Sequence, residues 1–389
     1  MFKKRSIAVV TGSRAEFGLL KPVLQKIKDD EQLELKLYVT GMHIEGRFGR
    51  TVTEITAAGF DISKQVDIFL QDDTPRGVSR STALSMMGFA DIFATDRPDV
   101  LLVLGDRFEI FGAVSAACVH GIPVAHIHGG ELTEGVMDEQ FRHCITKMSH
   151  IHFTATDEYR NRVIQMGEQP DRVFNTGSPA VDAILAVDLI SKDQLESELG
   201  LRFKEKNLLI TFHPVILDEM SPKEQFVEML KALDATEAYL IFTYANADTG
   251  GTEINKLIED YVSANQERAY VTKSFGHQRY LSVLNQCTGM VGNSSSGILE
   301  AAVCKKGAVN IGIRQKGRVR GDNVIDCGIS AREIALAITK LESESFQTSL
   351  TDLELPYGDG KSAERIVAIL KEIELGGISI KKFNDLEMK

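Results

Sequence analysis

Short continuous runs of apolar residues alternate with longer stretches of helical spacing, and this alternation is the feature that most limits the fold. Ser6–Val10 is the first such run, and Phe17, Leu20 and Ile27 then recur at the spacing of one helix face. Similar runs lie at 35–39, 100–104, 124–127 and 151–154, and a second series lies at 208–212, 240–244, 269–271, 290–291 and 309–311. Continuous rather than alternating apolar residues are typical of strands covered on both faces, as in a parallel sheet.

A polar stretch rich in Lys and Glu, residues 191–207, separates the two series of strands. A chain of 389 residues is also too long for one ordinary core. We therefore predict an α/β fold of two Rossmann-like, doubly wound parallel-sheet domains that face each other. The expected domains are 1–177 and 178–365, followed by a C-terminal helix and tail at 366–389 that could pack back on the first domain. Because such sheets bind ligands at the carboxyl ends of their strands, we expect a ligand between the two domains.

The charge and the cysteines limit the partners and the compartment. The chain has 55 acidic and 44 basic residues, a net charge of -11, which argues against bulk binding to nucleic acid or to an anionic membrane. No apolar run approaches the ~18 residues of a membrane span. The first apolar run stops at Val10 before the charged Arg14, which is unlike an export signal. Five scattered cysteines without a CxxC pair are typical of a reducing compartment, so we predict a cytoplasmic protein.

Two polar triplets directly follow predicted strands of the first domain. Gly12-Ser13-Arg14 opens a helix, where free backbone N–H groups favour an anion, although a tight turn with an exposed arginine explains the triplet equally well. Gly105-Asp106-Arg107 sets an acid and a base at the end of a central strand. An Asp that caps a helix is the simpler interpretation of the second triplet taken alone.

The run "GNSSSGILEAAV", residues 292–303, places three serines between a strand and a predicted helix. Because a helix cap needs one hydroxyl, Ser294 and Ser295 together indicate a turn that holds a pyrophosphate. Glu300 could accept hydrogen bonds from both hydroxyls of a ribose. The following loop, "IGIRQKGRVRG", contains Arg314 and three further cations, which favours anion binding over an ordinary solvated loop.

Two nucleotide motifs are absent from the sequence. "GDGKS", residues 358–362, resembles the end of a P-loop, but Leu355 stands where that motif requires glycine. No G-x-G-x-x-G follows any predicted strand. A dinucleotide cofactor is therefore not supported.

The densest group of titratable residues is "HIHGGELTEGVMDEQFRH", residues 126–143. His126, His128 and Glu131 suggest a metal site, but their spacing matches no ligand pair on a helix. We favour acid–base chemistry from side chains at several strand ends, among them Asp106 and Asp138. His213, after the strand at 208–212, adds an imidazole from the second domain. A buried, satisfied histidine remains the alternative for any single one of these.

With these residues assembled, the chain resembles the bacterial hydrolysing UDP-N-acetylglucosamine 2-epimerases of the sialic-acid pathway type. The matching runs span nearly the whole chain in order: "TGSRAEFG", "VTGMH", "LGDRFEIFGA", "HIHGGE", "RHCITKMSH", "QMGE", "FHPV", "NADTG", "GNSSSGILE" and "IGIRQKGRVRG". The resemblance implies the two-domain arrangement known as GT-B, a homodimer or homotetramer, and no metal or other cofactor. UDP-GlcNAc and UDP are the implied partners, in sialic acid or capsule polysaccharide biosynthesis.

The resemblance also implies the roles of individual residues. The catalytic carboxylates fall at or near Asp106, Glu131 and Asp138, and His213 is included among the catalytic groups. Many relatives have Glu where this chain has His128, so either His128 takes over proton transfer or Glu131 does. The implied UDP-binding residues are Arg14, Arg107, Arg142, His213, Asn246, Ser294, Ser295, Gly297, Glu300 and Arg314, with the backbone around Ser274 and Phe275 at the uracil.

The implied reaction eliminates UDP from C1 while a base removes the C2 proton, and water then adds to the resulting glycal. Related enzymes act on UDP-2,4-diacetamido-2,4,6-trideoxy sugars in legionaminic-acid pathways, and the sequence does not identify the sugar. A UDP-sugar glycosyltransferase shares the two-domain plan, but it would not require the cluster at 126–143. A binding module without catalysis is disfavoured by the many titratable groups at strand ends.

Overall fold

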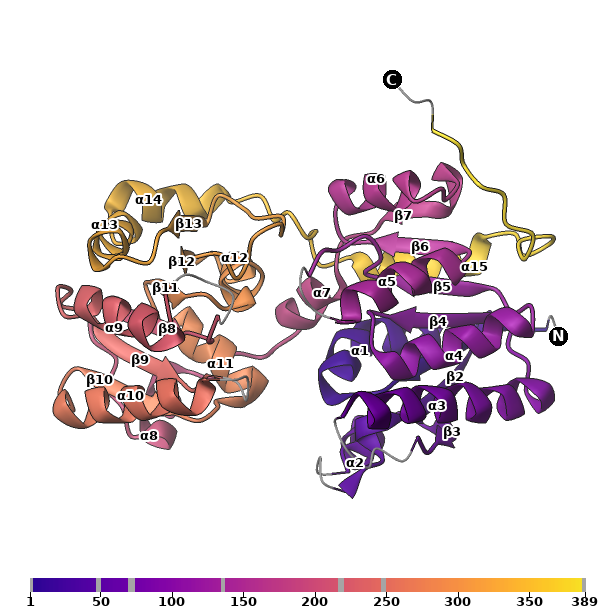
Figure 1. The fold of residues 1–389 in the computed structure, drawn as a ribbon, viewed down its shortest axis with the longest axis horizontal. Coiled ribbons are helices and arrows are strands. Elements are labelled where there is room, and N and C mark those ends of the chain that lie inside the picture. Colours follow the sequence, from indigo (N-terminus) through magenta and orange to yellow (C-terminus); the bar gives the residue numbers. More distant parts are fainter. Residues whose placement is uncertain are drawn as a thin grey trace. The chain divides into compact units, whose positions relative to one another are not determined.

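The chain forms two compact units in a computed structural model, which describes residues 3–46, 50–68, 74–133, 137–215, 220–245 and 250–386 (Figure 1). The first unit comprises Met1–Ala183 and Tyr357–Lys389, and the second comprises Ile184–Pro356. The domain ends expected from the sequence are 177 and 365. In the structure the chain passes from the first unit to the second after residue 183 and returns after residue 356. The second unit is thus an insertion into the first.

The sheet of the first unit has seven parallel strands. Their order is β3 (Ile62–Val66), β2 (Leu33–Thr40), β1 (Arg5–Thr11), β4 (Val100–Leu104), β5 (Val124–Ile127), β6 (Ile151–Thr154) and β7 (Val173–Asn175). The order of the strands reverses between β1 and β4. The carboxyl ends of these two strands therefore form a switch point, the usual ligand position in such sheets.

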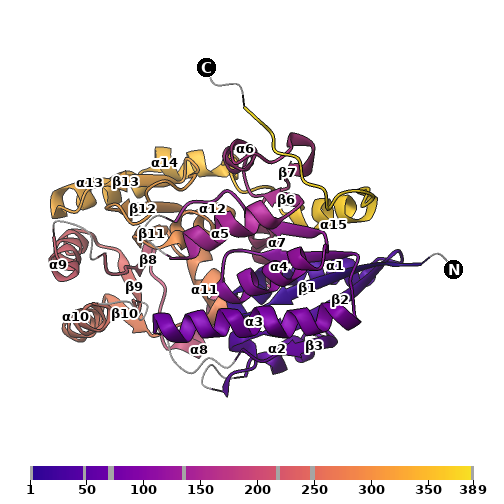
Figure 2. The ribbon, with the colours of Figure 1, turned by 45° about the vertical axis from the view of Figure 1, so that its right-hand side comes forward.

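Helices cover both faces of this sheet, because successive strand residues point to opposite sides. Ile7 and Val9 belong to the core cluster on one face, and Ala8 and Val10 belong to the cluster on the other. The first face carries α1 (Arg14–Asp29), α2 (Val52–Ala57) and α15 (Ser362–Glu372), and the second carries α3 (Pro75–Thr95), α4 (Phe108–Val119) and α5 (Met137–Met148), which lie in front of the strands in Figure 2. The remaining helices are α6 (Asp157–Gln165) and α7 (Pro179–Leu185). The helix with Ile366 and Leu370 thus packs in the first unit, against α1.

The second unit repeats the plan with six parallel strands. Their order is β10 (Ala269–Thr272), β9 (Tyr239–Thr243), β8 (Asn207–Thr211), β11 (Gly289–Gly292), β12 (Gly307–Ile311) and β13 (Val324–Cys327). The helices are α8 (Lys192–Leu199), α9 (Pro222–Leu233), α10 (Gly251–Ala264), α11 (Gly276–Asn285), α12 (Glu300–Val303), α13 (Ala331–Leu341) and α14 (Glu344–Ser349). The switch point here lies between β8 and β11.

The predicted fold class, two doubly wound parallel-sheet domains, is confirmed. The central strands have nearly the predicted bounds, whereas β3, β7 and β13 were not predicted. These three are edge strands, and β3 exposes its middle residues, so the continuous apolar pattern does not apply to them. Among the helices in the described ranges, none is long and apolar enough to cross a membrane.

Candidate active site

The switch point of the first unit brings together the two predicted polar triplets. Ser13 caps α1 by accepting a hydrogen bond from the Glu16 amide (3.3 Å), and Arg14 pairs with Glu54 on α2 at 2.9 Å. The Arg14 side chain is nevertheless 71% exposed, so it remains accessible to a ligand. The simple cap and the accessible arginine are both present in this triplet.

Two buried carboxylates, Glu16 and Glu109, lie beneath this turn and were not predicted. The Glu16 Oε2 atom accepts from the Gly12 amide at 2.8 Å, and a Cβ on Gly12 would lie only 2.4 Å from Glu109 Oε1. A side chain at position 12 would therefore require the Glu109 side chain to move. Within the described part of the chain, Glu16 Oε1 and Glu109 Oε2 are buried without a hydrogen-bond partner. Burial, together with the nearby charge of Glu109, raises the pKa of Glu16 to about 8.

Arg107 interacts electrostatically with the same two carboxylates. Its Nε atom forms an ion pair with Glu109, and its Nη2 atom lies 3.6 Å from the sulfur of Met42. About a third of the Arg107 side chain, 34%, remains exposed. Glu109 thus compensates a cation placed at the end of β4. An isolated Glu among the apolar residues of α4 was the available signal in the sequence.

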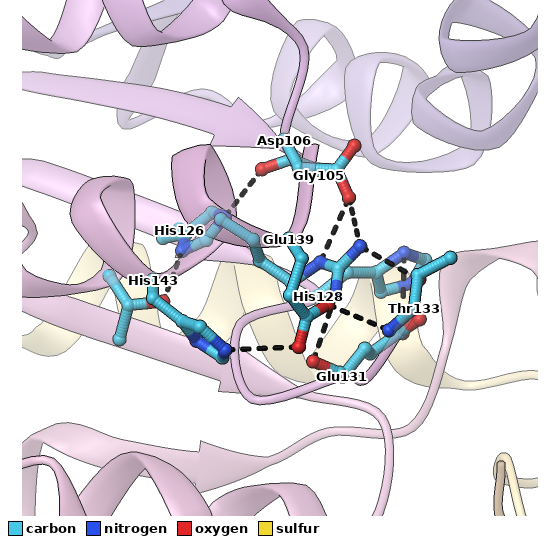
Figure 3. Close-up of polar contacts among 10 residues, drawn as sticks. Gly105, Asp106, His126, His128, Glu131, Thr133, Glu139 and His143 are labelled. Atoms are coloured by element: carbon cyan, nitrogen blue, oxygen red, sulfur yellow. Dashed lines mark hydrogen bonds and ion pairs between the residues drawn. The ribbon is translucent and has the colours of Figure 1, made fainter. Parts of the chain in front are cut away.

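Arg142 on α5 bonds to several residues of the predicted acid–base cluster, and Figure 3 labels its partners Asp106, Glu131 and Glu139. Its guanidinium donates from Nε to Asp106 Oδ2 at 2.8 Å, and from Nη2 to the same oxygen. Nη1 donates to Glu139 Oε2 at 2.5 Å and to the Glu131 carbonyl at 2.9 Å. The Arg142 side chain is only 5% exposed. We therefore regard it as the residue that orients Asp106 and the loop after β5.

His126 has a structural environment. Its Nε2 atom donates to the Gly105 carbonyl (2.7 Å), and its Nδ1 atom lies 3.2 Å from the hydroxyl of Thr146. Burial lowers the pKa of His126 to about 3, so the ring is neutral at physiological pH. With both nitrogens engaged, His126 has no lone pair for a metal. No set of three His, Cys, Asp or Glu in the described ranges is arranged to hold a metal ion.

His128 and Glu131 lie side by side in the loop after β5. The backbone of His128 is left-handed, with φ at 68°, which is uncommon for a residue other than glycine. The imidazole Nδ1 atom is 3.7 Å from Glu131 Oε1. Asp138 follows in the first turn of α5. Burial raises the pKa of Asp138, and the negative charge of Asp106 adds to this effect. The carboxylate of Asp106 is paired with Arg142, and its charge acts on Asp138.

In the second unit, Asn293 joins the residues at the switch point. Its Oδ1 atom accepts from the His213 amide (2.7 Å), and its Nδ2 atom donates to the His213 carbonyl (2.8 Å). The Asn293 carbonyl accepts from Gln315 Nε2 at 2.8 Å and from Arg314 Nη1 at 3.2 Å. The preceding Gly292 is indispensable, because a Cβ there would lie 2.0 Å from the Thr211 carbonyl. Asn293 thus holds the backbone of His213 and the guanidinium of Arg314. The sequence indicated Asn293 only as part of the serine turn.

The serine turn differs from the helix expected after it. Ser294 caps a single 3-10 turn, Ser295–Gly297, and α12 has only four residues. Gly297 packs tightly on Ala308, where a Cβ would make a 3.0 Å contact. A short helix offers little dipole, so hydroxyls and the Asn293 network are the features suited to an anion. Burial raises the pKa of Glu300, the predicted ribose acceptor.

The remaining predicted binding residues lie on other loops of the second unit. Ser274 accepts from the Gly276 amide at 3.1 Å, and Phe275 is buried with its ring stacked on Tyr270. Asn246 lies outside the described residues. Arg320, a cation of the basic loop, forms an ion pair with Asp326. Arg314 is thus the cation of that loop that is bound to the switch-point network.

Replacement of Glu16 by Gln tests the buried acid. The folded protein binds the Glu16 proton more tightly than the unfolded chain, because the pKa rises from 4.5 to about 8. The free energy of unfolding should therefore fall as the pH rises from 5 to 8, by up to about 1.4 kcal/mol per pH unit, and change no further above 8. Glu16→Gln should lose less stability over this range in urea denaturation. Glu34→Gln, at an exposed position, is the control; equal losses in all three proteins would contradict a neutral Glu16.

The chain is similar to known proteins over most of its length. The family model described as UDP-N-acetylglucosamine 2-epimerase matches residues 25–371. The chain is 39% identical over 385 residues to the GDP/UDP-N,N'-diacetylbacillosamine 2-epimerase (hydrolyzing) of Campylobacter jejuni subsp. jejuni serotype O:2, covering 98% of this chain and 100% of the relative. It is 37% identical over 370 residues to a polysialic acid biosynthesis protein of Escherichia coli, covering 95% and 94%.

A solved structure supports the fold. The crystal structure of UDP-GlcNAc 2-epimerase from Neisseria meningitidis bound to UDP-GlcNAc matches with a TM-score of 0.75 and 20% identity, covering 94% of this chain and 99% of that one. The match of the family model over most of the chain, together with 39% identity along almost its whole length, shows that this protein belongs to the UDP-N-acetylglucosamine 2-epimerase family.

Proposed function

We propose that the protein is a hydrolysing 2-epimerase that converts a UDP-linked 2-acetamido sugar and water into UDP and the free C2 epimer. In the first step the C1–O bond to UDP breaks, and a base takes the C2 proton, leaving a glycal. In the second step the oxygen of water adds at C1, and a proton returns to the opposite face of C2. The observation that carries the proposal is the group of carboxylates in unlike environments around Arg142.

The sugar is defined by its 2-acetamido group, which the candidate substrates share. The description of the family favours UDP-GlcNAc, which would give N-acetylmannosamine. The name of the Campylobacter relative favours UDP-N,N'-diacetylbacillosamine, a 2,4-diacetamido-2,4,6-trideoxy sugar. The name of the Escherichia coli relative suggests a place in polysialic acid or other surface polysaccharide synthesis. The two sugars differ at C4 and C6, so direct assay separates them.

The nucleotide is assigned mainly to the second unit. Arg314 and His213 would meet the diphosphate, because Asn293 holds both beside the serine turn. Cations and hydroxyls there would stabilise the charge that develops on departing UDP. Glu300 is assigned to the ribose and the Phe275 loop to the uracil, as the resemblance implies. Arg14 and Arg107 of the first unit would add positive charge.

Proton transfer is assigned to the first unit. Asp138 is suited to act as an acid, because burial raises its pKa. Asp106 is a carboxylate held by two hydrogen bonds from Arg142, which is suited to a base in a fixed position. Glu131 and His128 complete the group. Removal and return of a carbon-bound proton require two groups, one that is deprotonated and one that is protonated.

Incubation with the nucleotide sugar alone tests the reaction. We expect UDP and free sugar in equal amounts, because water replaces an acceptor. NMR of the product formed in deuterated water should show deuterium at C2. The assay is run separately with three substrates: UDP-GlcNAc, UDP-N,N'-diacetylbacillosamine and the GDP derivative of the latter sugar. A product without deuterium at C2, or one that is epimerised but still bound to UDP, would reject elimination and hydration.

Arg314→Ala tests the nucleotide site. Hydrogen bonds to a charged group contribute about 1.5–3 kcal/mol each, so loss of the guanidinium should weaken UDP binding by about tenfold or more. Isothermal titration calorimetry measures the change. Arg320→Ala removes a cation of the same loop that is paired with Asp326 and should leave the affinity nearly unchanged. Equal affinity in all three proteins would exclude Arg314 from the site.

Asp106→Asn separates chemistry from binding. The amide keeps the shape of the side chain but removes the base, so kcat should fall by about 100-fold or more. UDP affinity should change little, since the assigned nucleotide contacts lie mainly in the second unit. Thermal melting establishes that the variant is folded. Turnover within a few-fold of the unmodified protein would move the base to another residue.

A further inference from the structure

The left-handed backbone of His128 points to a constraint on its side chain. Residues other than glycine adopt this conformation rarely, and they retain it where surrounding contacts determine it, often at active sites. The His128 amide donates to the Phe153 carbonyl at 3.0 Å, and the side chain is only 13% exposed. The backbone that carries the imidazole is therefore fixed, and the ring itself is largely buried.

Both ring nitrogens of His128 face protein groups. Nε2 lies 2.9 Å from the hydroxyl oxygen of Ser178, and Nδ1 lies 3.7 Å from Glu131 Oε1. The Glu131 side chain is 25% exposed, about twice the fraction for His128. The Glu131 carboxylate is therefore more accessible to a proton of a substrate than the ring nitrogens of His128 are. His128 is thus the more buried member of the pair.

The hydroxyl of Ser178 has a defined direction. Its oxygen already accepts from the Ala180 amide at 3.2 Å, which leaves its proton free to donate to Nε2 of His128. If Nε2 accepts, the neutral ring carries its proton on Nδ1, toward Glu131. We propose that Ser178 is a positioning residue that sets the Nδ1–H tautomer of His128, so that the ring stabilises and orients the Glu131 carboxylate for proton transfer. Only the role of Glu131 in this statement rests on the proposed function.

Ser178 is itself fixed where the chain passes between the two units. Its amide donates to the Tyr357 carbonyl at 2.7 Å. The segment that leads out of the first unit is thus bonded to the segment that re-enters it at Tyr357. The two segments meet at glycines in left-handed conformations, and a Cβ on Gly177 would lie 3.0 Å from the Tyr357 carbonyl and 3.1 Å from the Gly358 Cα. The Ser362 hydroxyl donates to the Gly177 carbonyl at 2.9 Å. A close backbone contact thus locates the hydroxyl that meets His128.

The tautomer is measurable by NMR of the histidine ring nitrogens at alkaline pH, where ordinary imidazoles are neutral. His128→Gln identifies the signals of His128 among the nine histidines. In the unmodified protein we expect a protonated Nδ1 and an accepting Nε2. Ser178→Ala should shift the ring toward a mixture of tautomers, and Ser178→Thr, which keeps the hydroxyl, should preserve the single form.

Kinetics provide the second readout. Ser178→Ala should lower kcat about five- to tenfold, the loss expected from one hydrogen bond, with KM and UDP affinity unchanged. Ser178→Thr should keep most of the turnover. Ser149→Ala is the matched control, because Ser149 is a buried serine of the same unit whose hydroxyl bonds the Ile145 carbonyl instead. If Ser178→Ala does not fold, Ser178→Cys replaces it, since a thiol is a weak donor of similar size.

Two results would overturn the inference: an unchanged His128 tautomer in Ser178→Ala, or equal losses of kcat in Ser178→Ala and Ser149→Ala. A protein that turns over none of the nucleotide sugars would instead reject the proposed function. The tautomer measurement still decides the role of Ser178 in that case, because it needs no substrate.

Discussion

The guanidinium of Arg142 is the contact on which the acid–base site of the first unit depends. It is almost fully buried, yet it satisfies its donors with Asp106, Glu139, the Thr133 hydroxyl and the Glu131 carbonyl. Burying one cation is costly unless charged partners surround it, so this guanidinium and its carboxylates require one another. The bonds join the end of β4, the loop after β5 and the helix α5. The end of β4, where Asp106 lies 36 positions before Arg142, is thereby held against the loop after β5 and the helix that follows it.

In the second unit a neutral side chain, that of Asn293, connects the loops at the strand ends. The side-chain amide of Asn293 bonds both the amide and the carbonyl of His213, and its own carbonyl receives Arg314 and Gln315. An amide supplies a donor and an acceptor in fixed geometry, which suits a link between two loop backbones. Gly292 permits this arrangement, since any side chain there would collide with Thr211.

The sequence was sufficient to predict the central strands and the positions of most candidate residues, because both follow from continuous apolar runs and the polar residues after them. The edge strands β3, β7 and β13 were missed, since partly or fully exposed residues interrupt that pattern in each, whereas the edge strand β10 was predicted at 269–271. Glu16 and Glu109 were missed because burial of a carboxylate depends on packing around Gly12, which no local spacing encodes. The contact of His128 with Ser178 is likewise invisible in the sequence, where fifty positions separate the two residues. The helix predicted after the serine turn has only four residues, because Ser295–Gly297 form a 3-10 turn and Gly297 packs on Ala308, a contact that local spacing does not encode.

The insertion of one unit into the other has a consequence for synthesis on the ribosome. Ala363, Ile366 and Leu370 belong to the core of the first unit, yet they follow the entire second unit along the chain. Because the chain leaves the ribosome from its N-terminus onward, the face of the first sheet that α15 covers stays open until the whole second unit has been translated. The inserted unit has all of its own strands by then and can fold earlier. The first unit to be translated is thus the last to be completed, and its uncovered apolar surface is where chaperones would be expected to bind.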